Sequence, residues 1–92
     1  MGARVSFDSG SKDVRELTNM IGSLAKLLVD IPEEVFVNEV AGENTTVIEL
    51  RVAKSDLGKV IGKEGKTARA MRTILNGAST KIRRRTVLEI LE

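Results

Sequence analysis

The feature that most constrains the fold is a pair of glycines, Gly62 and Gly65, that interrupts a helical pattern in the second half of the sequence. Before the pair, Leu57, Val60 and Ile61 have the i, i+3, i+4 spacing of a short amphipathic helix. After it a second helix is predicted from residue 66, and its expected inward-facing residues are Thr67, Met71, Ile74, Leu75 and Ala78. Glycine adopts backbone conformations that are closed to other residues. We therefore expect two helices that meet at a tight turn.

An amphipathic helix is also predicted near the start of the chain, over residues 13–30. Asp13 with Glu16 resembles a capping box. Pro32 ends the helix, because the residue before a proline is forced out of the helical region. A further helix cap is expected at Ser55, just before the short helix of the glycine turn. The expected core-facing stripe of the first helix comprises Val14, Leu17, Ile21, Leu24, Ala25 and Leu28.

Three strands complete the predicted order α-β-β-α-α-β. Residues 35–40 are rich in β-branched side chains and residues 45–53 alternate in polarity, so these two strands should form an antiparallel hairpin. A third strand, 86–91, follows a basic connection at 81–85. Gly77 either ends the helix before that connection or is tolerated inside it. The sequence predicts an α+β domain with the helices packed on one face of a three-stranded sheet.

Composition favours a binding protein over an enzyme. The chain has no His and no Cys, which removes the usual proton carrier of acid–base catalysis, thiol nucleophiles and Cys-based metal sites. No apolar run is long enough to cross a membrane, and no signal peptide is evident, so we expect a cytoplasmic protein. Residues 1–11 are expected to be a flexible leader and residues 12–92 a single domain. We expect no cofactor, metal or small-molecule substrate.

Positive charge is concentrated in the C-terminal part of the chain. The net charge is +2, but residues 1–53 sum to −4 and residues 54–92 to +6. A basic half on a small domain points to a polyanionic partner, with nucleic acid first. The alternative interpretation is a charged, solvated surface without a specific partner.

The segment Gly62-Lys63-Glu64-Gly65, here called the GXXG loop, is predicted to bind an anion. The helix that resumes after it presents N–H groups at its N-terminus, where hydrogen bonds and the helix dipole favour a phosphate. Four basic side chains surround that point: Lys59, Lys63, Lys66 and Arg69. A nucleotide-hydrolysing P-loop fits poorly, because residue 60 is a valine where that motif requires a glycine.

The sequence around the loop resembles the signature of KH domains, in which V-I-G-K-x-G is the central piece. Residues 57–67 read LGKVIGKEGKT, and the order α-β-β-α-α-β is that of a type II KH fold. The resemblance implies that the GXXG loop holds the backbone of about four nucleotides of single-stranded RNA. The two Phe are the only aromatic residues of the chain, so stacking platforms are lacking and only a modest base preference is expected.

The stretch from about residue 13 to residue 92 is similar to the KhpA family, small bacterial proteins that consist of little more than one KH domain. The family pattern is matched in order by Leu27–Asp30, Pro32, Thr46–Leu50, the loop signature, Ala68–Thr73 and Val87–Leu91. Membership would imply an RNA chaperone or post-transcriptional regulator linked to cell elongation and division. It would also imply a homodimer or a heterodimer with a larger KH protein of the KhpB/Jag type. The leader and the very basic segment Lys81–Arg85 depart from the pattern.

The resemblance predicts the RNA-binding residues Lys59, Val60, Ile61, Gly62, Lys63, Glu64, Gly65, Lys66 and Arg69. Lys63 is expected to contact the sugar–phosphate chain, and Glu64 to point away or to temper the affinity. Val60 and Ile61 would receive base faces, together with Ile48 or Leu50 from the sheet, or would simply be core.

Two further alternatives stay open from the sequence. Arg72 and Arg83–Arg85 either contact phosphates or only solvate the surface. The whole domain is either an RNA-binding protein or a KH-fold dimerisation module that acts mainly through a protein partner.

Overall fold

A computed structural model of the protein describes residues 10–92. Its helices and strands follow the predicted order α-β-β-α-α-β. The predicted leader lies largely outside the described residues. Helix α1 begins at Gly10, three residues before the predicted start. The elements are α1 (Gly10–Leu28), β1 (Phe36–Ala41), β2 (Thr45–Arg51), α2 (Leu57–Ile61), α3 (Lys66–Ile82) and β3 (Arg85–Ile90), with single 3₁₀ turns η1 (Pro32–Glu34), η2 (Lys54–Asp56) and η3 (Lys63–Gly65).

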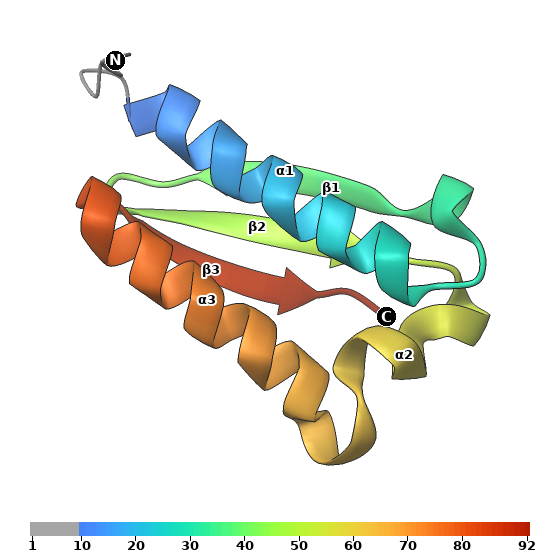
Figure 1. The fold of residues 1–92 in the computed structure, drawn as a ribbon. Coiled ribbons are helices and arrows are strands. Elements are labelled where there is room, and N and C mark those ends of the chain that lie inside the picture. The colour runs from blue at the N-terminus through green and yellow to red at the C-terminus, as the bar shows by residue number, and fades with distance from the viewer. Residues whose placement is uncertain (1–9) are drawn as a thin grey trace, which may run out of the picture.

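The three strands form one mixed sheet in the order β1-β2-β3. Strands β1 and β2 pair antiparallel, with Phe36 opposite Arg51, which confirms the predicted hairpin. Strands β2 and β3 pair parallel, with Thr45 opposite Arg85. A parallel pair needs a long crossover connection. Here that connection comprises α2, the GXXG loop and α3, which leave the sheet at one end and return along its face (Figure 1).

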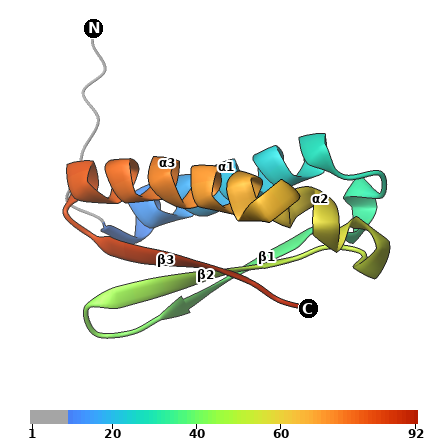
Figure 2. The same ribbon diagram turned by 90° about the horizontal axis from the view of Figure 1, so that it is seen from below.

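The molecule has two layers, with the helices on one side and the sheet on the other (Figure 2). The core between the layers contains Ile21 of α1, Ile48 and Leu50 of β2, Val60 of α2 and Leu75 of α3, none of them more than 1% exposed. Each element contributes its apolar stripe to this interface, so burial of that area provides the main driving force for the fold. The prediction that the helices pack on one face is confirmed.

No helix of the described residues covers the opposite face of the sheet (Figure 2). Val40, Val47 and Val87 lie in one row across all three strands of this face. Val40 and Val87 are 46% and 45% exposed. The face therefore has a narrow apolar stripe that is open to solvent.

Two predicted core positions on the helices are wrong. Leu28 is 40% exposed, because it is the last residue of α1. Helical spacing predicts which side of a helix faces the core, but not how far along the helix the core extends. Ile74 is 50% exposed, because α3 packs through a stripe one position away that includes the small residues Ala68 and Ser79. The hydroxyl of Ser79 hydrogen-bonds that of Thr86 in β3, and this buried polar contact keeps the helix close to the strand.

The connection between α3 and β3 is shorter than predicted. Helix α3 runs through Gly77 to Ile82, so Lys81 belongs to its last turn. Arg85 is already the first residue of β3. Only two arginines, Arg83 and Arg84, remain between the two elements.

Candidate nucleic-acid interface

The GXXG loop begins at a position that only glycine can occupy. Gly62 has φ 81° and ψ 167°, and its N–H donates to the carbonyl of Gly58 at 2.8 Å, which ends α2. A Cβ at Gly62 would lie 2.2 Å from Oγ1 of Thr67 and 2.8 Å from the backbone N of Thr67. Thr67 therefore packs directly against the loop backbone. The sequence predicted only that this residue faces inward. The loop is seated on the first turn of α3.

The second half of the loop turns through left-handed backbone. Glu64 (φ 58°, ψ 25°) and Gly65 (φ 74°, ψ 13°) both lie in this region. The N–H of Gly65 donates to the carbonyl of Gly62 at 3.0 Å, which closes the turn. A Cβ at Gly65 would meet nothing nearer than Nη1 of Arg69, at 3.8 Å. Space around Gly65 is therefore open, in contrast to Gly62.

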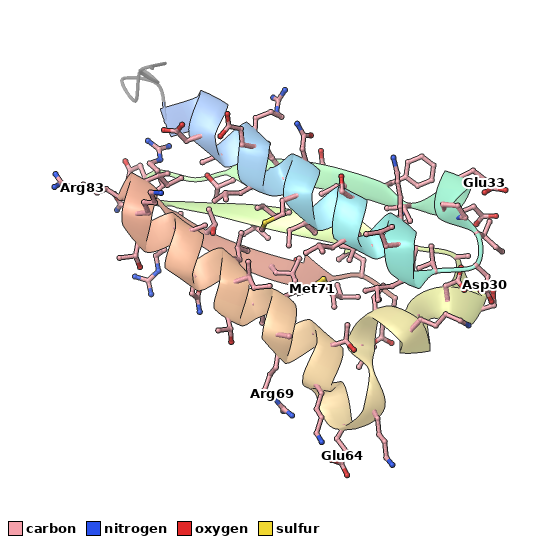
Figure 3. All side chains as sticks on the ribbon, viewed as in Figure 1. Asp30, Glu33, Glu64, Arg69, Met71 and Arg83 are labelled. Atoms are coloured by element: carbon pink, nitrogen blue, oxygen red, sulfur yellow. The ribbon has the colours of Figure 1, made fainter. Side chains whose placement is uncertain are left out.

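The charged side chains of the loop are exposed to solvent. Lys66 and Glu64 approach each other only to 4.0 Å, and their side chains are 73% and 70% exposed. An ion pair this open contributes little. Glu64 lies at the tip of the loop and points away from the domain (Figure 3). Lys63 is exposed beside it, with no carboxylate within 4 Å among the described side chains.

Arg69 is brought to the loop, as predicted. Its Nη2 donates to the carbonyl of Glu64 at 3.0 Å and so braces the loop from α3. The guanidinium is exposed and retains further N–H donors for a ligand. One turn further on, Nε of Arg72 reaches the carbonyl of Leu88 in the edge strand β3, at 3.4 Å.

Lys59 is directed away from the loop and into an ion-pair network. Its Nζ lies 3.3 Å from Asp30 and 3.6 Å from Asp56. The carboxylate of Asp56 is buried and accepts hydrogen bonds from the N–H groups of Asp30 and Ile31. Asp56 therefore ties the end of α1 to α2. The predicted cap at Ser55 is wrong. Ser55 lies inside η2, and the residue that directly precedes α2 is Asp56.

The pKa values of this network show how its charges are held. Burial acts to raise the pKa of Asp56, but the two backbone N–H groups and Lys59 outweigh it and keep that pKa below its usual value. The hydrogen bond and attraction to Asp30 raise the pKa of Lys59, with a smaller contribution from Asp56. Both groups are therefore charged at neutral pH. The positive charge of Lys59 is compensated by the carboxylates of Asp30 and Asp56.

The apolar residues predicted to receive bases are mostly core. Val60 has no exposed surface, and Ile48 and Leu50 are also fully buried. Ile61 is half-buried and borders the loop. A direct contact with a base requires exposed surface, so Ile61 is the one residue of these four that can offer it, and Val60 supports the loop from below.

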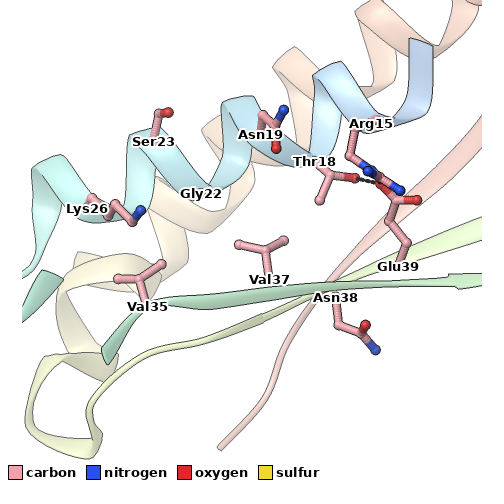
Figure 4. Close-up of a pocket in the computed structure, with 10 residues that line it drawn as sticks. All are labelled: Arg15, Thr18, Asn19, Gly22, Ser23, Lys26, Val35, Val37, Asn38 and Glu39. Atoms are coloured by element: carbon pink, nitrogen blue, oxygen red, sulfur yellow. Dashed lines mark hydrogen bonds and ion pairs between the residues drawn. The ribbon is translucent and has the colours of Figure 1, made fainter. Parts of the chain in front are cut away.

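A groove away from the GXXG loop lies between α1 and β1 (Figure 4). At its end Glu39 accepts hydrogen bonds from Nε of Arg15 (3.1 Å) and Oγ1 of Thr18 (2.6 Å). Within residues 13–92 no group of His, Cys, Asp and Glu could hold a metal ion. None of the described helices is both long and apolar enough to span a bilayer.

Comparison with known proteins identifies the family. Residues 18–90 match the family described as KhpA/KhpB, KH domain. The RNA-binding protein KhpA of Aquifex aeolicus is 56% identical over 84 residues, which cover 91% of this chain and 99% of that protein. The RNA-binding protein KhpA of Clostridium acetobutylicum is 47% identical over 75 residues, 82% of this chain and 100% of the relative.

A solved structure, that of a variant of Era from Aquifex aeolicus, has a similar fold. The TM-score is 0.54 at 21% sequence identity, over 80% of this chain and 29% of the Era chain. This likeness concerns the fold alone. The family match and the long, highly identical alignments carry the assignment: the chain belongs to the KhpA/KhpB family of KH domains.

Proposed function

We propose that the protein binds single-stranded RNA through the GXXG loop. The observation that carries the proposal is the loop itself, a glycine-built turn seated on the first turn of α3, with Lys63 and Lys66 exposed and Arg69 bracing it. Relatives of high identity are named RNA-binding proteins. The same comparison favours a binding protein over an enzyme.

The proposed contact is mainly electrostatic. The phosphates of about four nucleotides would lie along the loop, where the N-terminus of α3 and the exposed lysines favour negative charge. Ile61 would offer apolar surface to a base, and the loop itself contains no aromatic residue. One such domain should bind weakly and with modest base preference, so pairing of two domains would raise the affinity through effective concentration.

Pairing and cellular role are further parts of the proposal, and the family resemblance supports them. We propose that the protein works in the cytoplasm as an RNA chaperone or post-transcriptional regulator connected with cell elongation and division. We also propose that it forms a homodimer or a heterodimer with a KhpB/Jag-type KH protein.

The second candidate function is a dimerisation module that acts through a protein partner. The uncovered face of the sheet favours it, because Val40, Val47 and Val87 form an apolar row there in which Val40 and Val87 are exposed and Val47 is half-buried. The two candidates differ in one measurable property. Binding of RNA phosphates must weaken as salt rises, whereas apolar pairing through the sheet need not.

Fluorescence anisotropy with a labelled single-stranded RNA pool at several salt concentrations tests the proposal. The test variant combines Lys63→Asp with Glu64→Asp, which makes the loop acidic and keeps both glycines. Aspartate is tolerated in left-handed backbone, so the conformation at residue 64 is retained. The control combines Lys26→Asp with Glu33→Asp on the α1 side of the molecule, and circular dichroism checks that both variants fold.

Salt-dependent binding by the wild type and the control, lost in the loop variant, would support the proposal. Equal binding by all three proteins would place the RNA contact elsewhere. A wild type that binds no RNA but associates with itself would favour the dimerisation module.

A further inference from the structure

Helix α3 ends in a turn whose residue type is unfavourable for stability. The N–H of Arg83 donates to the carbonyl of Thr80 at 3.2 Å, and that of Arg84 to the carbonyl of Ser79 at 3.1 Å. This pattern is the Schellman ending of a helix, in which the left-handed position is usually glycine. Arg83 occupies that position here, with φ 60° and ψ 36°. A strained residue that packing does not require points to a role for its side chain.

The surroundings of this turn suit an anion. A hollow between α3 and β3 is lined by Asn76 and Thr80 of α3, Asn44 of the β1–β2 turn and the run Arg83–Arg85. Among residues 10–92 no carboxylate lines it. All three arginines are exposed, and in the described part of the chain none has a carboxylate within 4 Å. The hollow is therefore lined by three arginines together with residues that carry amide and hydroxyl groups.

A line of basic and neutral polar residues along α3 connects this hollow to the GXXG loop. The helix contains no Asp or Glu over its 17 residues. Arg69, Arg72, Asn76 and Thr80 are spaced three or four residues apart and so share one side of it. This side of α3 runs along the edge of β3, because Arg72 contacts Leu88 of that strand and the hollow lies between the helix and the strand. Arg83 and the GXXG loop lie at opposite ends of the helix (Figure 3).

The length of this line exceeds what the loop can occupy. With a rise of about 1.5 Å per residue, α3 is about 25 Å long. A stacked strand carries one phosphate about every 3.4 Å, so roughly seven phosphates would cover that distance. The GXXG loop accounts for about four nucleotides. An RNA strand that follows the line past the loop would reach the arginines.

We propose that Arg83–Arg85 form a second RNA-backbone contact, which extends the bound strand along the α3–β3 edge beyond the nucleotides held at the GXXG loop. This inference rests on the proposed function, because it assumes that RNA binds at the loop. It makes binding depend on RNA length. A strand that fills only the loop leaves the arginines unused, and a longer strand engages both ends of α3.

The test measures the salt dependence of binding for degenerate RNAs of about five and about twelve nucleotides. The variant combines Arg83→Gly with Arg84→Ser, which suits the left-handed turn better than the wild type does. The control combines Lys26→Gln with Arg51→Gln, which removes the same charge from surfaces away from the line. Each phosphate contact in single strands contributes about 0.7 to the slope of log affinity against log salt.

We expect the two-arginine variant to lower the slope for the longer RNA by about 1.4 and to leave the shorter RNA unchanged. The control should leave both slopes unchanged, because it removes no phosphate contact. Identical slopes for variant and wild type, or an equal loss for both lengths in the two-arginine variant, would overturn the inference and leave the loop proposal intact. A wild type that binds neither length would overturn both.

Discussion

Replacing Gly62 with alanine should destabilise the domain far more than the same change at Gly65, although both glycines have positive φ. The difference comes from what surrounds them. At Gly62 the new methyl group would meet Oγ1 of Thr67 at 2.2 Å and the backbone N of Thr67 at 2.8 Å. The backbone N cannot move without shifting the start of α3. At Gly65 the nearest atom is 3.8 Å away, at the flexible end of Arg69.

The magnitudes follow from strain and crowding. At Gly62 the glycine-only backbone region costs about 1–3 kcal/mol for alanine. Overpacking adds about 1–3 kcal/mol, so we expect a loss of about 4 kcal/mol. At Gly65 left-handed backbone costs about 1–2 kcal/mol. Alanine also lowers the conformational entropy of the unfolded chain, which stabilises the folded state by about 0.4–1 kcal/mol. The net loss of unfolding free energy is therefore about 1 kcal/mol or less.

Urea unfolding followed by circular dichroism measures both losses as changes in the free energy of unfolding. Gly77→Ala is the matched control, because Gly77 lies inside α3 with no atom within 4 Å of the added methyl group. That change should stabilise the domain by about 1 kcal/mol. If Gly62→Ala costs no more than Gly65→Ala, the proposed seating of the loop on Thr67 is wrong.

Three other predictions concern the rest of the domain. Arg83→Gly should raise the free energy of unfolding by about 1 kcal/mol through relief of the left-handed arginine, and a calorimetric scan should show Tm higher by about 4–8 °C. Because the pKa of Asp56 is lower in the folded state than its ordinary 3.8, the carboxylate stabilises the fold above pH 3.8 and loses this effect as the pH falls further. Asp56→Asn should therefore be less stable than the wild type at neutral pH, with a deficit that shrinks in acid unfolding titrations below pH 3.8. Leu75→Ala should cost about 2–5 kcal/mol in urea unfolding, whereas Ile74→Ala, at a half-exposed position, should cost about 1 kcal/mol or less.

The order of elements and the GXXG loop were predictable because their signals are local. Apolar spacing, β-branched runs and glycine pairs reflect the conformation of neighbouring residues, and they fixed the hairpin, α2 and α3 correctly. Element ends were less accurate. The arginine at position 83 ends α3 in a conformation that usually calls for glycine, and no local rule predicts a helix end there.

The details of the site could not be predicted where they depend on distant partners. Its position three residues before Gly62 predicted Lys59 to be part of an anion site, but Asp30, far away in the sequence, pairs with it. Asp56 looked like one more polar residue before a helix, although it is the buried anchor of that pair. Thr67 gave no functional signal at all, since its role depends on its close contact with Gly62, a residue without a Cβ.

The parallel pairing of β2 with β3 also has a consequence for folding. The segment that joins them, residues 52–84, contains the whole binding loop, so the last strand can join the sheet only after this long segment has closed. The hairpin of β1 and β2 is local and can form early. Pairing of β3 therefore belongs to the slow, non-local stage of folding, and it closes residues 52–84, with the binding loop among them, into a segment whose two ends are both held by the sheet.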